Sequence, residues 1–138
     1  MRINWLAILV ALIVQQVLGF TWYSRALFAE AWMAGIGKRP EDLVPTPGPF
    51  ILATIAAILL PIGIAWILHR TNLRGIKNGA LVGLGVGVLL VAPPVLVHEA
   101  FLGYPPTVLA IDAGKEIVGC FIVGVILGAW PRRDPTHV

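Results

Sequence analysis

The residues best able to do chemistry are a few ionisable side chains inside or beside long apolar stretches. Asp112, Lys115 and Glu116 fall within one such stretch, and His98 and Glu99 end the preceding one. Spacings of three and four place Asp112, Lys115 and Glu116 on one face of a helix. Three kinds of chemistry fit this set: an ion-pair network, a site for a ligand, ion or proton, and a metal site built from the histidine and the carboxylates.

The sequence weakens the metal and enzyme alternatives. It contains no His-Glu-x-x-His pattern and no cysteine cluster, and Lys115 would repel a bound cation. Ser24 is the only serine, and the glycine-rich run 83–87 lacks the Gly-x-Gly-x-x-Gly spacing. Cys120 stands alone in an apolar run, which is typical of a small packing residue. We expect no metal, no cofactor and no catalytic residue, and the sequence leans away from an enzyme.

Composition indicates which elements must position these side chains. The chain has 138 residues, of which 58% are hydrophobic and 12% are charged. A soluble domain is about half apolar and about a quarter charged, so a soluble enzyme, a nucleic-acid-binding protein and a disordered segment are excluded. Four apolar stretches approach the ~20 residues that cross a bilayer as a helix. These stretches are residues 3–23, 50–68, 79–101 and 107–130.

We therefore predict an all-α integral membrane four-helix bundle that forms a single transmembrane domain over residues 1–138. The start of residues 3–23 resembles a signal peptide, but the stretch is long enough to remain as the first helix. Residues 24–36 are predicted to be a short interfacial helix, and the proline-rich residues 37–49 a solvated linker. Aromatic side chains near the ends of these segments are expected to anchor the protein at the membrane interface. These anchors are Trp22, Tyr23, Trp32 and Trp130.

The positions of Lys and Arg predict the orientation. With four spans, six of these residues lie on the side of the two termini: Arg2, Arg70, Arg74, Lys77, Arg132 and Arg133. The opposite side has three: Arg25, Lys38 and Arg39. By the positive-inside rule both termini are predicted to be cytoplasmic. The ionisable residues would then lie in the outer half, together with two glutamines of the first span. This predicted polar cluster comprises His98, Glu99, Asp112, Lys115, Glu116, Gln15 and Gln16.

Small residues and prolines in the spans predict how the helices meet. Glycines recur every four residues in the third and fourth spans, at Gly79, Gly83, Gly87, Gly124 and Gly128. Such stripes let helix backbones approach closely, either within one chain or between two copies, and the sequence leaves both open. Pro61 and Pro93-Pro94 are expected to kink their helices and to free backbone carbonyl groups, which neighbours or water must satisfy.

Two stretches of the sequence are distinctive: residues 18–33 (LGFTWYSRALFAEAWM), and residues 111–118 (IDAGKEIV) running on to Trp130. The first resembles the exit from the first helix, and the second the last helix, of the DUF1761 family of small bacterial membrane proteins of uncharacterised function. The resemblance implies four helices and a bacterial inner membrane, and no activity. In the family pattern a proline follows Trp-Tyr-Ser and an Asn-Ala-Gly precedes a Tyr-His pair. This chain has Arg25, Asp112 and Lys115-Glu116 there, so its charged residues are partly its own.

Three functions remain open from the sequence. The first is a non-enzymatic homo-oligomeric or accessory subunit that packs through its glycine-rich helix faces in the bilayer, alone or in a larger membrane complex. The second is a small transporter or channel with an outward-facing polar site at Asp112, Lys115, Glu116 and His98. The third is a membrane enzyme, which has the least support. Nucleic acid is not an expected partner.

Overall fold

Local sequence signals decide where the helices begin and end. The Asn4 side chain accepts hydrogen bonds from the backbone N–H groups of Leu6 and Ala7, at 3.2 and 3.3 Å, and so caps the first helix. Pro47 opens another helix at a position where its missing N–H costs nothing. Gly37, at a φ of 68°, closes the second helix in the left-handed conformation that glycine adopts without strain.

The computed structural model describes residues 4–130, and within this range the regular elements are all helical. They are α1 (Trp5–Trp22), α2 (Ala29–Ile36), η1 (Pro40–Asp42), α3 (Pro47–Arg70), α4 (Ile76–Val86), η2 (Gly87–Val91), α5 (Ala92–Phe101) and α6 (Pro106–Ala129). The all-α prediction is confirmed for these residues. The structure places the second apolar helix from Pro47 to Arg70, slightly longer than the predicted 50–68.

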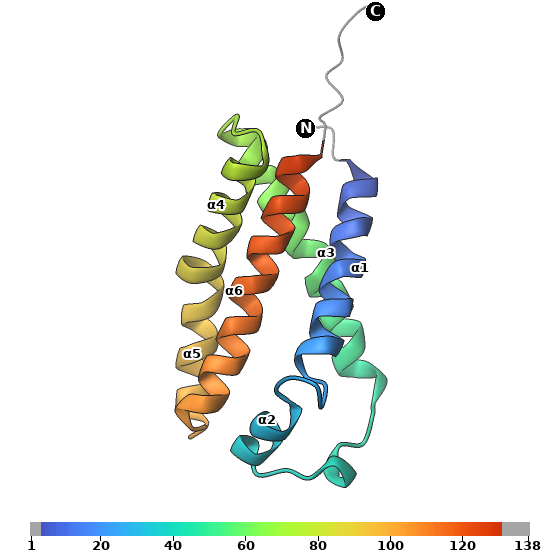
Figure 1. Cartoon of the computed structure of the whole chain (residues 1–138), viewed down its shortest axis with the longest axis vertical. Coiled ribbons are helices and arrows are strands. Elements are labelled where there is room, and N and C mark those ends of the chain that lie inside the picture. Colours follow the sequence, from blue (N-terminus) through green and yellow to red (C-terminus); the bar gives the residue numbers. More distant parts are fainter. Residues whose placement is uncertain (1–3, 131–138) are drawn as a thin grey trace, which may run out of the picture.

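Three helices of the described residues are long and apolar enough to cross a membrane: α1, α3 and the continuous segment α4–η2–α5 from Ile76 to Phe101. The remaining long helix, α6, is as long as α3, with 24 residues each, but it carries Asp112, Lys115 and Glu116. Helix α6 contacts α1, α2, α3, α4 and α5, so the most charged of the long helices is also the most central. The start of α1, the turn from α3 to α4 and the end of α6 lie at one end of the molecule (Figure 1).

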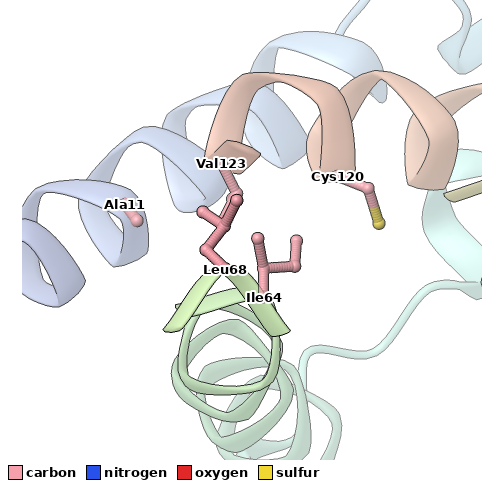
Figure 2. Close-up of a cluster of buried hydrophobic side chains, with 5 residues drawn as sticks. All are labelled: Ala11, Ile64, Leu68, Cys120 and Val123. Carbon is pink, nitrogen blue, oxygen red and sulfur yellow. The ribbon is translucent and has the colours of Figure 1, made fainter. Parts of the chain in front are cut away.

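Many of the buried side chains are small, and many large apolar side chains face outward. The buried apolar residues include Ala7, Ala11, Ala57, Ala92 and Ala113, whereas Phe20 and Leu89 are 68% and 72% exposed. A soluble protein rarely exposes apolar surface on this scale, but lipid solvates it without cost. One cluster of buried residues joins α1, α3 and α6 (Figure 2). Its members are Ala11, Ile64, Leu68, Cys120 and Val123, so the prediction of a buried packing role for Cys120 is confirmed.

The glycine stripes bring α4 and η2 against α6 within the chain. A Cβ atom added at Gly79 would overlap the carbonyl oxygen of Gly124, and one added at Gly83 would overlap that of Cys120. At Gly87 and Gly128 an added Cβ would come within about 3 Å of backbone atoms of the facing helix. Only glycine therefore permits this approach, and the stripes form an intrachain contact. We call Gly79, Gly83, Gly87, Gly124 and Gly128 the glycine interface.

The two proline sites are accommodated differently. Pro61 has no N–H, so the carbonyl of Ala57 lacks its helical donor, and the side chain of Gln15 supplies one at 2.9 Å. The Pro93-Pro94 pair follows the π-helical turn η2, in which the N–H of Ala92 donates to the carbonyl of Gly87. A π turn is a known way for a helix to widen before a proline. The helix therefore continues through the pair.

The segment after α1 folds back onto α6. Of the predicted interfacial helix 24–36, residues Ala29–Ile36 form α2. An added Cβ at Gly35 would overlap the Val108 side chain and lie 3.3 Å from Pro105, so α2 rests directly on the start of α6. The predicted linker 37–49 contains η1 and the first turn of α3. Arg2, Arg132 and Arg133, on which the predicted orientation depends, lie outside the described residues.

Candidate functional site

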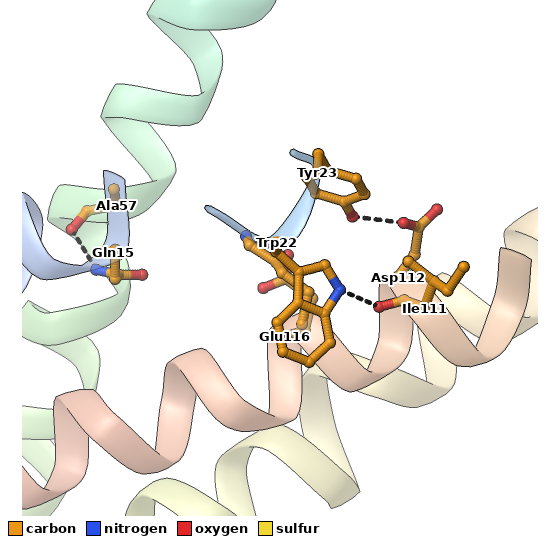
Figure 3. A network of polar contacts seen from close by, with 8 residues as sticks. Gln15, Trp22, Tyr23, Ala57, Ile111, Asp112 and Glu116 are labelled. Carbon is orange, nitrogen blue, oxygen red and sulfur yellow. Dashed lines mark hydrogen bonds and ion pairs between the residues drawn. The ribbon is translucent and has the colours of Figure 1, made fainter. Parts of the chain in front are cut away.

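Asp112 is the centre of the polar contacts in this half of the molecule. It lies in the second turn of α6, about 9 Å along the helix from its start at the usual 1.5 Å rise. The Tyr23 hydroxyl, just after α1, donates a hydrogen bond to Asp112 Oδ1 (Figure 3). The indole Nε1 of Trp32, in α2, donates to Asp112 Oδ2 at 3.0 Å. One carboxylate thus joins three helical elements.

A second carboxyl group faces Asp112 from α5. The carboxyl groups of Glu99 and Asp112 lie close enough to interact. Within residues 4–130, Glu99 Oε2 is the only buried side-chain oxygen or nitrogen that receives no donated hydrogen bond. Buried polar atoms are almost always satisfied, so this oxygen requires an explanation. We call Tyr23, Trp32, Glu99 and Asp112 the Asp112 site.

Neighbouring aromatic residues fix the geometry of the Asp112 site. Trp22 Nε1 donates to the carbonyl oxygen of Ile111 at 3.0 Å (Figure 3). The Trp22 ring covers Gly114, where an added Cβ would lie 3.5 Å from the indole. Tyr23 and Trp32 meet edge to face, with their ring centroids 5.3 Å apart. The exit from α1 is therefore held on α6 by aromatic packing as well as by hydrogen bonds.

Trp22, Tyr23 and Trp32 were expected to be interfacial anchors, and the sequence reasoning missed their hydrogen bonds to α6. The signal was available: three aromatic N–H or O–H donors follow one apolar helix in a chain with few other polar groups. Buried Tyr and Trp side chains usually find an acceptor. Trp130, the fourth expected anchor, lies at the end of α6, where its backbone N–H donates to the carbonyl of Ile126.

Lys115 and Glu116 form an ion pair next to the Asp112 site. The Lys115 Nζ lies 2.8 Å from Glu116 Oε1, and the two side chains are 26% and 29% exposed. The helical spacing also allowed Lys115 to pair with Asp112. The observed partner is instead the adjacent residue, so Lys115 neutralises Glu116 and is not the partner of Asp112.

The remaining members of the predicted polar cluster are not joined to Asp112. Gln15 donates to Ala57, and Gln16 Nε2 lies 3.4 Å from Thr54 Oγ1, so both glutamines serve the α1–α3 contact (Figure 3 shows the Gln15 bond). The imidazole-bearing residue His98 is exposed on α5. In the part of the chain that the structure describes, no three His, Cys, Asp or Glu side chains are grouped to hold a metal ion.

The fold and the site together define a class: over residues 4–130 the protein is all-helical, with three apolar helices of membrane-spanning length packed around a central helix, α6, that carries Asp112. The chain belongs to the DUF1761 family, described as proteins of unknown function, whose pattern matches residues 6–128. The resemblance seen in the sequence is thus confirmed over most of the chain. No curated protein and no solved structure matches the chain.

Proposed function

We propose that the protein is a polytopic protein of the bacterial inner membrane in which α6 forms a fourth span. Helix α6 contacts each of the other α-helices, and these contacts would shield its charged residues in part from lipid. Charged residues in membrane helices normally face the bundle interior, where partners reduce their cost. The excess of Lys and Arg on the side of the termini supports cytoplasmic termini, and with them an Asp112 site in the outer half of the membrane.

The function that this geometry supports best is that of a small transporter or channel component that takes up a proton or a small cation at the Asp112 site. A single observation carries this proposal. The carboxyl groups of Glu99 and Asp112 lie close together, no ion pair to either is found within residues 4–130, and the ammonium group of Lys115 is held by Glu116. Paired carboxyl groups at membrane depth are costly, and in membrane proteins such groups mark ion and proton pathways.

A liposome assay tests the proposed transport. The purified protein is reconstituted with a pH-sensitive dye inside the vesicles, and a potassium diffusion potential drives proton entry. We expect Asp112→Asn to abolish the protein-dependent acidification. Glu41→Gln, which neutralises an exposed carboxylate in the linker, is the matched control and should retain it. Equal rates for the unmodified protein, Asp112→Asn and empty liposomes would refute proton transport, and replacing protons by sodium or potassium flux tests the cation alternative in the same vesicles.

A second candidate is an accessory or homo-oligomeric subunit, and one observation favours it. The first ten residues of α3, from 47 to 56, are all exposed, including the large side chains of Phe50, Ile51 and Leu52. The glycine interface is occupied within the chain, so a partner would bind here instead. Light scattering of the protein purified in mild detergent tests this candidate, and a particle that contains a single chain and no other protein would contradict it.

A further inference from the structure

The unsatisfied oxygen of Glu99 is explained if a proton lies between the two carboxyl groups. Two ionised carboxylates are acceptors only, so neither can donate to the other. Glu99 Oε2 is buried and receives no donor from residues 4–130, and the group that faces Glu99 is Asp112. Protonation of Glu99 makes its carboxyl group a hydrogen-bond donor, and the neighbouring Asp112 carboxylate is an acceptor. We propose that Glu99 and Asp112 share one bound proton.

The hydrogen bonds of the Asp112 site decide which carboxyl group carries the proton. Asp112 receives the Tyr23 hydroxyl on Oδ1 and the Trp32 indole N–H on Oδ2. Both donors stabilise a negative charge on Asp112. Each carboxylate oxygen accepts more than one hydrogen bond, so Asp112 also has room for a third donor. The proton therefore resides on Glu99 and is donated to Asp112.

The charges around the pair agree with this assignment. The end of α1 contributes the Tyr23 hydroxyl, and α2 contributes the uncharged Trp32 indole. On α6, Glu116 and Lys115 neutralise each other, and on α5 His98 is exposed. Uptake of one proton converts the Glu99 carboxylate to a carboxylic acid, which lowers the charge of the pair from minus two to minus one. On release, the O–H bond of Glu99 breaks and the proton passes to water.

The shared proton would be the ligand that the proposed transporter takes up at the Asp112 site, so the inference rests on the proposed function. The proton bound to the pair is nevertheless a property of the resting protein and can be measured without transport. If the proton is present and liposomes show no flux, the proposed function fails and the inference stands. If flux occurs and no proton is bound, the inference fails alone.

Infrared spectroscopy of the full chain in detergent tests the inference directly. A protonated carboxyl group has a C=O stretching band separate from those of carboxylates and amides, and this band shifts in heavy water. We expect the unmodified protein at neutral pH to show the band, and Glu99→Gln to lose it. Glu116→Gln, which alters the neighbouring carboxylate, should keep it, and Asp112→Asn should shift it because the acceptor changes.

A second measurement keeps the inference testable if Glu99→Gln does not fold. The unmodified protein is prepared with carbon-13 in the carboxyl groups of its glutamates, and the band should move to the lower frequency of the heavier isotope. Absence of a protonated carboxyl band at neutral pH would overturn the inference. The inference would also be overturned if the band remained in Glu99→Gln, or if its frequency did not change with the carbon-13 label in the glutamates.

Discussion

Gly83→Ala is the sharpest test of the glycine interface. The added Cβ would overlap the carbonyl oxygen of Cys120 and lie 3.1 Å from the Cα atom of Gly124. These are backbone atoms, which cannot rotate aside as a flexible side chain does, so α4 and α6 would have to move apart. Gly85→Ala is the matched control, because a Cβ at Gly85, two residues further along the same helix, meets nothing within 4 Å.

The expected magnitude follows from the difference between the two variants. Alanine favours a helix over glycine by about 1 kcal/mol, and this gain is the same at both positions and cancels. What remains is the cost of overpacking at Gly83, about 1–3 kcal/mol in a well-packed interior. Gly83→Ala should therefore be less stable than Gly85→Ala by that amount, and Gly85→Ala should be at least as stable as the unmodified protein.

Reversible unfolding in mixed micelles, driven by a denaturing detergent and followed by helical circular dichroism, measures the free energy of unfolding of both variants. Light scattering on the same samples reports whether the number of chains in the particle changes. Equal free energies for Gly83→Ala and Gly85→Ala would refute the intrachain contact. So would a Gly83→Ala protein that changes its oligomeric state while its unfolding is unaltered, because the stripe would then join two copies.

Two further predictions concern polar contacts between helices. Gln15→Leu should lower the free energy of unfolding by about 1–3 kcal/mol, because a buried carbonyl loses its donor. In a Pro61→Ala background the same change should cost less, since position 61 then supplies the N–H that proline lacks; an equal cost in both backgrounds would contradict this reasoning. Trp32→Phe should cost about 1 kcal/mol through the lost hydrogen bond to Asp112, whereas Trp66→Phe, at a side chain 54% exposed, should be near neutral in the same unfolding assay. A Trp32→Phe protein as stable as Trp66→Phe would show that this bond does not hold α2.

Properties that depend on composition and local spacing could be predicted from the sequence. Low charge and long apolar runs indicated helices of membrane-spanning length, and α1, α3 and the segment α4–η2–α5 have that character. Two short motifs indicated the family, whose pattern matches residues 6–128. The glycine spacing indicated a flat helix face, and Cys120 was correctly placed in the interior. Each of these properties depends on residues that are near one another in the sequence, so it can be predicted without the fold.

The choice of partners was decided by the tertiary structure. Lys115 had two carboxylates within helical reach, and in the fold it pairs with Glu116, whereas Asp112 receives aromatic donors from the exit of α1 and from α2. Gln15 was expected beside the ionisable residues, yet it turns to the carbonyl that Pro61 leaves free.

The sequence also leaves open which helix the glycine stripes pack against, because their spacing is identical whether the facing helix belongs to the same chain or to another. A hydrogen bond or a close helix contact depends on which surfaces meet in space. That meeting depends on how α1, α2 and α5 are arranged around α6, which no spacing along a single helix specifies.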